Sequence, residues 1–251
     1  MKRNTYKFQY TKPKWNKEGN EKLGDMWSWS TIYGNDRYYI PKWDVTVTGT
    51  CGKHCGGCKD HCYVKKSYRY PSVIQGHAGN TLAMREDIVM TTSELLRAIR
   101  AARKKPEIIR LNQSGEIETV ETLQMFESLA AFNPSIKFYL YTKNYEAVES
   151  ELNAGMIPDN LIINISIWHE YGVKEYLRMK KYENVKAFVY VDPKKEGGWN
   201  VSEYEKHGIN IQTFCTAYDE NGKLNKDMPC QKCGKCFRKN DRLKVVGCND
   251  H

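Results

Sequence analysis

Residues 161–168 have the sequence LIINISIW, and this stretch decides the fold class. Isoleucine recurs at every second position, while Asn164 and Ser166 occupy two of the positions between, which is the two-residue period of a β-strand. We interpret the stretch as an inner strand whose apolar face packs against the core. Its other face carries Asn164 and Ser166, which can line a cofactor cavity; a solvent-facing strand is the alternative.

Strand and helix patterns alternate along the chain around this stretch. Further strands are predicted at 43–50, 107–111, 137–142, 185–191 and 209–214, and helices at 93–104, 119–132, 145–153, 171–179 and 201–207. Repeats of this kind with apolar strands predict an α/β fold in which helices cover a parallel sheet. An open doubly wound sheet and a partial barrel both fit, and in both of them ligands collect at the carboxyl ends of the strands.

Composition and charge limit the class of protein. Hydrophobic residues make up 40% of the 251 residues, which is enough for a sizeable core. No apolar run approaches the roughly 18 residues of a membrane helix, and the N-terminus lacks the apolar segment of a secretory signal, so we expect a cytoplasmic protein with no membrane partner. The formal charge of +9 and the many Tyr and Trp residues suit nucleic acid as a partner, and a solvated Lys-rich surface is the alternative.

The nine cysteines form two groups separated by a long stretch that contains none. In a reducing compartment, cysteines at CxxC spacing are more often metal ligands or redox groups than disulfides. Both groups follow a predicted strand, so we expect both at the ligand-binding edge of the sheet. The first group contains Cys51, Cys55, Cys58 and Cys62, and the second contains Cys215, Cys230, Cys233, Cys236 and Cys248.

The first group has the spacing Cys51-x3-Cys55-x2-Cys58, which is that of radical S-adenosylmethionine (SAM) enzymes. In those enzymes three thiolates hold a 4Fe-4S cluster and leave one iron open, and that iron binds the amino and carboxylate groups of SAM. Glycines between the cysteines let the chain curl around a compact ligand. Gly57 departs from the pattern, because an aromatic residue usually precedes the last ligand. A four-cysteine zinc site is the alternative.

The second group contains successive CxxC steps, which are typical of ferredoxin-like iron–sulfur sites, whereas zinc ribbons use paired CxxC motifs with a longer spacer. We therefore expect a second, closed 4Fe-4S cluster that transfers electrons or contacts substrate, with zinc as the alternative. The spacing is Cys215-x14-Cys230-x2-Cys233-x2-Cys236, and the spare candidate ligands after it are Cys248 and His251.

A turn between the two groups supplies candidate cofactor contacts. Ser114, Gly115 and Glu116 follow a predicted strand and precede a helix. Gly115 lets the backbone approach a ligand, and Glu116 can accept a hydrogen bond from a cofactor ammonium group; a helix N-cap is the alternative. Lys143, at the end of another strand, can contact the cofactor carboxylate, although an exposed lysine is the commoner case.

These motifs together resemble the phage gene product 88 family, a radical-SAM-like group. Matching elements span residues 51–251: Cys51 and Cys58, then CYVKK at 62–66, IRLNQSGE at 109–116, FYLYTK at 138–143, and the closing cysteines with His251. Departures from the family pattern are Val64 in place of Ala, Glu116 in place of Asp, and the additional Cys55.

The additional cysteine leaves two ligand sets for the first cluster, Cys51/Cys55/Cys58 and Cys51/Cys58/Cys62. We favour Cys62 over Cys55, because Cys62 matches the family element and is flanked by aromatic residues, as a radical SAM ligand is.

The resemblance implies a partial (β/α)6 TIM-like barrel of radical SAM type over residues 1–214, beginning with an irregular segment. Residues 215–251 are then a C-terminal cysteine-rich extension that binds the auxiliary cluster and packs on the same domain. The implied function is reductive cleavage of SAM to start radical chemistry on a substrate that the sequence does not identify, with an electron donor as partner, in the cytoplasm of the host cell. The alternative function is a non-enzymatic iron–sulfur or zinc protein that binds nucleic acid.

Overall fold

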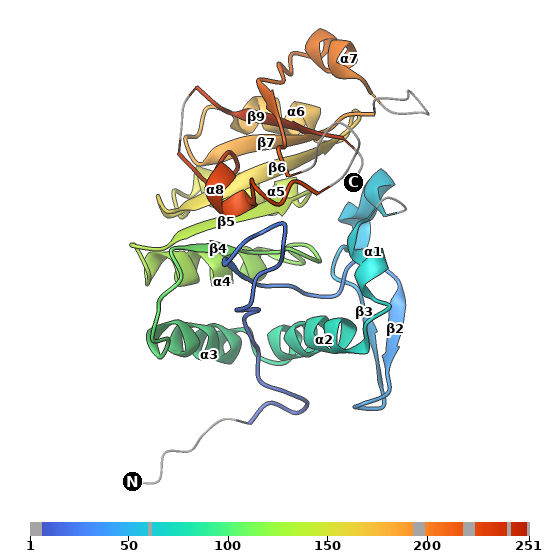
Figure 1. The fold of residues 1–251 in the computed structure, drawn as a ribbon, viewed down its shortest axis with the longest axis vertical. Coiled ribbons are helices and arrows are strands. Elements are labelled where there is room, and N and C mark those ends of the chain that lie inside the picture. The colour runs from blue at the N-terminus through green and yellow to red at the C-terminus, as the bar shows by residue number, and fades with distance from the viewer. Residues whose placement is uncertain (1–6, 60–61, 193–198, 218–223, 240–241, 250–251) are drawn as a thin grey trace.

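The structure is a computed structural model that describes residues 7–59, 62–192, 199–217, 224–239 and 242–249; for residues 55–57 it describes the backbone alone. Its centre is a seven-stranded sheet in which all neighbouring strands are parallel. Strands β1 and β8 form its two edges, so the sheet is open and does not close into a barrel (Figure 1). In spatial order the strands are β1 (Trp27–Ser28), β4 (Ile108–Arg110), β5 (Lys137–Thr142), β6 (Leu161–Trp168), β7 (Val185–Tyr190), β9 (Val245–Cys248) and β8 (Thr213–Phe214).

The main hydrophobic core lies between one face of this sheet and a layer of helices. Ile163, Ile165 and Ile167 of β6 belong to this core, as their alternation predicted. Among the described residues, no helix is long and apolar enough to cross a membrane. The helices that contribute to the core are α2 (Pro71–Glu86), α3 (Ile88–Arg100), α4 (Val120–Ala131), α5 (Tyr145–Asn153), α6 (Val173–Met179) and α7 (Val201–Lys206).

The other face of the sheet is covered by segments from opposite ends of the chain. A smaller core joins Leu23 and Met26 to Tyr139 and Ile162 of the sheet and to Phe237. The one-turn helix α8 (Cys230–Cys233) lies over the same face (Figure 1). The polar positions of β6 therefore face the cysteine-rich segment, and the alternative of a solvent-facing strand is wrong.

Residues 43–50 contain a strand, as predicted, but it does not join the parallel sheet. β3 (Val45–Thr48) pairs antiparallel with β2 (Arg37–Ile40) and forms a separate hairpin. The edge beside β4 is taken by β1, from the segment that was expected to be irregular. The hairpin leads into the 3-10 turn η1 (Gly52–Cys58) and the short helix α1 (Val64–Ser67), which carry and follow the first cysteine group.

The last strand of the chain, β9, lies inside the sheet between β7 and β8. The sequence analysis predicted no strand after residue 214, and this prediction is wrong. All four residues of β9 are buried, but a four-residue run is too short to display a period. Helix α2 was also missed, because its buried face mixes Gly, Asn and Thr with Ala and Met.

Candidate functional site

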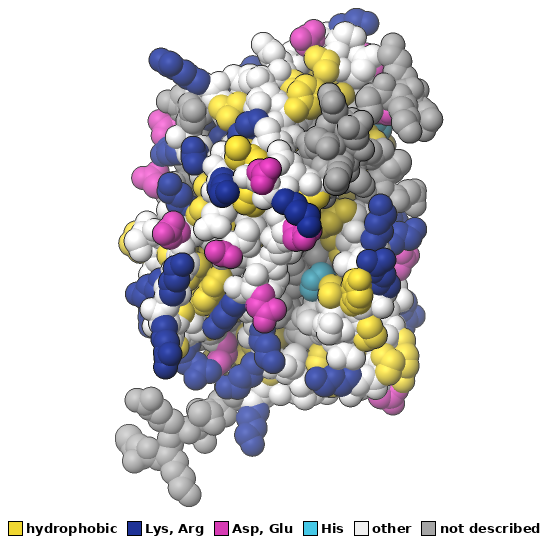
Figure 2. Space-filling model, in the orientation of Figure 1, with side chains coloured by type: hydrophobic (Ala, Val, Ile, Leu, Met, Phe, Trp, Pro, Cys, Tyr) yellow, Lys and Arg dark blue, Asp and Glu magenta, His cyan; other side chains and the backbone are white. Residues whose placement is uncertain are grey.

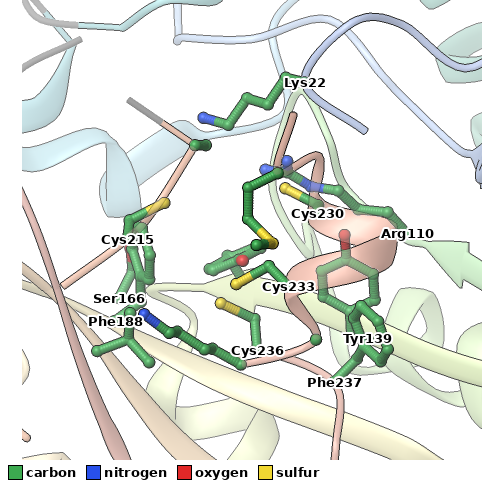
Figure 3. Close-up of a pocket in the computed structure, with 16 residues that line it drawn as sticks. Lys22, Arg110, Tyr139, Ser166, Phe188, Cys215, Cys230, Cys233, Cys236 and Phe237 are labelled. Atoms are coloured by element: carbon green, nitrogen blue, oxygen red, sulfur yellow. The ribbon is translucent and has the colours of Figure 1, made fainter. Parts of the chain in front are cut away.

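Four thiols of the second cysteine group line one cavity of about 160 Å³ on the second face of the sheet. Cys215 follows β8, Cys230 and Cys233 are the ends of α8, and Cys236 comes shortly after. Figure 3 shows the sulfur atoms of Cys215 and Cys230 on opposite sides of the cavity in that view. The fold therefore brings together the four cysteines that the sequence grouped.

The backbone around this four-thiol cavity is held by segments that are distant in the chain. The amide of Cys230 donates to the carbonyl oxygen of Lys22 at 2.8 Å, and the amide of Cys215 donates to that of Gly247 at 2.8 Å. The cysteines are thus fixed by the N-terminal segment on one side and by β9 on the other. A one-turn helix alone would give them little support.

Asn164, a predicted cofactor contact, joins β6 to the cysteine-rich segment. Its Nδ2 donates to the carbonyl oxygens of Leu140 and Cys236, at 3.0 Å each. Its Oδ1 is buried and has no hydrogen-bond partner in the described part of the chain. The side chain thereby anchors the backbone of Cys236 to the sheet.

Three basic side chains, Lys22, Arg110 and Lys235, line the four-thiol cavity, and Lys186 lies close by. Arg110 and Lys22 line it (Figure 3), and Arg110 Nε is buried without a hydrogen-bond partner among the described residues. Lys186 is fully buried near Cys236, where its Nζ donates to the carbonyl oxygen of Lys235 at 2.8 Å, and burial lowers its pKa to about 8. Buried cations are unfavourable unless an anionic group compensates them, so the buried Arg110 and Lys186 suit an anionic centre.

The pKa values of the thiols and the size of the cavity bear on whether the four cysteines would hold a zinc ion or an iron–sulfur cluster. Burial raises the pKa of Cys230 and Cys236, the latter to about 12, while Arg110 and Lys22 oppose this shift at Cys230. Among the described residues, no three His, Cys, Asp or Glu side chains converge closely enough for a single metal ion. The cavity of about 160 Å³ is also several times larger than the ~10–15 Å³ that one water-sized group needs. Four thiols are donors for both kinds of centre, and the cavity has room for more than one atom; which metal is bound stays a prediction.

The first cysteine group is held in a different way. Cys51 Sγ accepts a hydrogen bond from the amide of Gly34 at 3.1 Å. Cys58 Sγ accepts one from Lys143 Nζ at 3.0 Å. Cys58 and Cys62 line, together with Lys143, a second cavity of about 170 Å³. The thiols of this group thus receive hydrogen bonds from an amide and an ammonium group, which stabilise thiolates.

Lys143, another predicted cofactor contact, faces the first cysteine group. Burial alone would lower its pKa, but the Cys58 thiolate and the Glu116 carboxylate outweigh burial and raise it. Lys143 is therefore a cation at neutral pH. In this position it stabilises negative charge on Cys58.

The choice between Cys55 and Cys62 stays a prediction, because the side chain of Cys55 lies outside the described part of the chain, as does His251. Tyr63, which follows Cys62, is described. Its hydroxyl donates to the carbonyl oxygen of Gln113. This bond ties the end of the cysteine loop to the turn after β4.

The turn after β4 supports the first cysteine group from the other side. Gly115 has φ +82°, and a Cβ there would lie 2.0 Å from Thr31 Oγ1 and 2.5 Å from Thr50 Oγ1, so glycine is required. Thr50 directly precedes Cys51, and its Oγ1 accepts a hydrogen bond from the amide of Glu116 at 2.9 Å. The approach of Gly115 to a ligand stays a prediction; its close neighbours in the structure are these two threonines.

Glu116 and Ser114 make internal hydrogen bonds at this turn. The buried carboxylate of Glu116 accepts from Thr142 Oγ1 at 2.6 Å and from the amide of Lys143 at 2.8 Å. Burial raises the pKa of Glu116, and the nearby Lys143 opposes that shift. Ser114 Oγ donates to the carbonyl oxygen of Thr31 at 2.9 Å. Both residues were predicted as cofactor contacts; in the structure Glu116 holds the end of β5 and Ser114 holds the segment after β1.

Cys248 was grouped by sequence with the C-terminal cysteines, whereas the structure places it at the first group. It ends β9 and lines the same cavity as Cys58 and Cys62. Trp168 and Tyr190, whose rings stack at 3.8 Å between centroids, line that cavity too. The sequence contains no signal that connects these residues, because the pairing of β9 with β7 brings them together.

The two thiol-lined cavities share a wall. Ser166 of β6 and Phe188 of β7 are paired in register, and both line both cavities. Ser166, the remaining predicted cofactor contact, therefore lies between the two cysteine groups. Both residues are near the carboxyl ends of their strands, where the sequence predicted the ligand-binding edge.

A family model described as Gene product 88 matches residues 7–239. No curated protein and no solved structure matches the chain. The matched range contains the parallel sheet except β9, and every cysteine except Cys248.

Proposed function

The chain belongs to the gene product 88 family, and on that premise we propose that it is an iron–sulfur enzyme of radical SAM type with one 4Fe-4S cluster at each cysteine group. The observation that carries the proposal is the pair of thiol-lined cavities with a common wall of Ser166 and Phe188. When bound and reduced, a cluster with one open iron supplies the electron that cleaves SAM and so starts radical chemistry on a substrate.

At the first site, Cys51, Cys58 and Cys62 would hold the cluster. Three thiolates would leave one iron of the cluster without a protein ligand, and this iron could bind the amino and carboxylate groups of SAM. Lys143 compensates the charge at Cys58, and the Gly34 amide does so at Cys51. Hydrogen bonds to cluster sulfurs and nearby charge set the reduction potential of such a centre, so these two donors would tune it.

At the second site, four thiols would hold a closed cluster without an open position. Thr216 Oγ1 already donates to Cys233 Sγ at 3.2 Å. Arg110, Lys22 and Lys186 offset the negative charge that four thiolates bring into a buried place. A closed centre next to the first site suits electron transfer from an external donor, and Phe188 with Ser166 would separate the two centres.

The fold is compatible with this function. The sheet is parallel, and both cysteine groups lie near the carboxyl ends of its strands. A partial (β/α)6 barrel of radical SAM type has its active site at that end. We propose that the sheet described here, whose open edges are β1 and β8, likewise has its active site at the carboxyl ends of its strands.

The direct test is metal analysis of protein purified without oxygen. Two complete clusters predict about eight irons and eight acid-labile sulfides per chain. Electron paramagnetic resonance of the reduced protein should then change when SAM is added, because SAM would bind the open iron. Stoichiometric zinc without sulfide would refute the proposal.

A purely structural role for the metal is the second candidate. It is favoured by the segment between β8 and β9, in which the described regular structure is the one-turn helix α8, so that a bound metal would hold this segment folded. Protein of this kind would contain the clusters but leave their resonance signals unchanged on addition of SAM.

A further inference from the structure

We propose that a third cavity, beside the first cysteine group, binds the nucleotide units of a single-stranded nucleic acid. The cavity has a volume of about 700 Å³, which is within the ~300–1,000 Å³ of ordinary ligand sites. Nucleotide binding at this cavity does not depend on the proposed function. We also propose that the bound nucleotide is the substrate of the radical chemistry, which rests on the proposed function.

The nucleotide cleft, as we call this cavity, lies between segments that are far apart in sequence. Its walls come from the N-terminal segment, the turn of the β2–β3 hairpin, α1, α2 and the turn after β4. These walls pack closely: a Cβ on Gly79 of α2 would lie 2.5 Å from Thr11 and 3.2 Å from Trp43. The cleft is therefore a formed feature of the fold.

The cleft and the first cysteine group are separated by one side chain. Tyr63 lines both the nucleotide cleft and the cavity of Cys58 and Cys62. Its hydroxyl is fixed by Gln113, which lines the cleft as well. A ligand in the cleft would thus lie beside the site at which we propose that SAM binds.

The charge of the cleft favours a polyanion. Lys12, Lys14 and Lys42 line it, against one carboxylate, that of Glu18. Lys14 and Lys42 are exposed and form no ion pair within the described ranges, whereas Lys12 lies 3.7 Å from Glu94. Figure 2 shows Lys and Arg mixed with Asp and Glu over the face in view. The lining of the cleft, and not net surface charge, therefore defines the site.

The neutral groups of the cleft suit nucleobases. Trp43 provides an aromatic ring, and Lys42 Nζ lies over this ring at 5.4 Å from its centroid, so the cleft brings together a ring for a base and a cation for a phosphate. Ser28 Oγ is fully buried at the cleft and has no hydrogen-bond partner among the described residues. Gln75 and Gln113 add amide donors and acceptors. This mixture of cations, ring and amides recognises a nucleotide better than a simple anion.

The test is fluorescence anisotropy of a labelled oligothymidylate with anaerobically purified full-length protein, titrated at several salt concentrations. The double variant Lys14→Ala/Lys42→Ala should bind roughly tenfold more weakly at low salt. Its plot of log affinity against log salt should be shallower by about 1.4, because each phosphate contact to a single strand contributes ~0.7. The matched control is Lys180→Ala/Lys181→Ala, which removes two exposed lysines after α6, outside the cleft, and should bind like the wild type.

Two competing ligands, thymidine monophosphate and heparin, test whether the cleft recognises nucleotide units or negative charge alone. Thymidine monophosphate that displaces the oligonucleotide supports a site for single nucleotide units, whether they come from free nucleotide or from nucleic acid. Heparin that competes as well as the oligonucleotide at equal charge would overturn the proposal, because heparin has no bases. Equal binding by the Lys14/Lys42 variant and the wild type, or no binding of either nucleotide probe, would overturn it too. Iron content and the response to SAM are measured on the same samples, so that failure of the proposed function is recognised separately.

Discussion

The two cysteine groups differ in how they are enclosed. The second group has four thiols around one cavity, fixed by backbone bonds to both ends of the chain and surrounded by buried cations. The first group lies on a 3-10 turn, receives a hydrogen bond from Lys143, and has the nucleotide cleft beyond Tyr63. Each group has at least four cysteines in sequence, so the cysteine count does not distinguish them. Under the proposed function, the surroundings of the second site would suit electron transfer and those of the first would suit ligand binding.

The largest expected effect comes from breaking the second group. Cys233→Ala/Cys236→Ala should remove about half of the iron and make the segment after β8 sensitive to proteases, because a bound cluster would hold that segment folded. Iron analysis and limited proteolysis measure both effects. The control, Cys51→Ala/Cys58→Ala, should also lose about half of the iron while the same segment stays protected. An unchanged iron content in the first variant would show that the C-terminal thiols are not ligands.

The next prediction concerns which of Cys55 and Cys62 is a ligand of the first cluster. We expect Cys62→Ala to lose the first cluster and Cys55→Ala to keep it, because Cys62 lines the cavity with Cys58 and Lys143. Electron paramagnetic resonance of each reduced variant, with and without SAM, distinguishes them. If all four single variants of the first group lose the cluster and the wild-type signal ignores SAM, the site is closed and the enzyme proposal fails.

A smaller effect compares the glycines that support the two groups. Gly115→Ala should lower the free energy of unfolding by about 2–4 kcal/mol, because it forces a left-handed backbone and a clash with two buried threonines. Gly234→Ala should cost only about 1 kcal/mol, because the nearest atoms belong to the exposed side chain of Arg238, which can move. Chemical denaturation measures both. Equal losses of unfolding free energy would mean that the surroundings of Gly115 and Gly234 are equally rigid.

The smallest effect concerns one hydrogen bond at the first group. Lys143→Met should remove an ammonium–thiolate bond worth about 1.5–3 kcal/mol, weakening retention of iron at this site about tenfold or more. Competition with a chelator measures that retention. The control is Lys53→Met, whose ion pair with Glu146 is on the surface, with 69% of the lysine side chain exposed. If both variants retained iron equally, Lys143 would have no role at the site.

The sequence predicted the parts of the fold that have a clear period. Strands β4 to β7 and helices α4 to α7 were predicted within a few residues, since their apolar positions repeat at intervals of two or of three to four. The family was also recognised from the sequence, and the match over residues 7–239 confirms it. Residues 43–50 were counted among the strands of the parallel sheet, which was wrong, because a strand pattern does not identify the strand with which it pairs.

The sequence predicted which cysteines cluster together. It did not predict which distant segments of the chain lie next to each cluster. Local spacing identified the four thiols from Cys215 to Cys236, and the structure brings them together. The approach of Cys248 to Cys62 depends on the pairing of β9 with β7, which no local signal encodes. The nucleotide cleft was missed for the same reason, because its walls come from five segments that are separate in sequence.

The position of β9 has a consequence for synthesis of the protein. The ribosome releases the chain from its N-terminus onward, so β7 and β8 emerge before the strand that belongs between them. Until β9 arrives, the edge of β7 is open and can pair with another chain. Insertion of β9 into the sheet and arrival of Cys248 at the first cysteine group are then one event. The cavity of Cys58 and Cys62 is therefore complete only after β9 has been released and paired with β7.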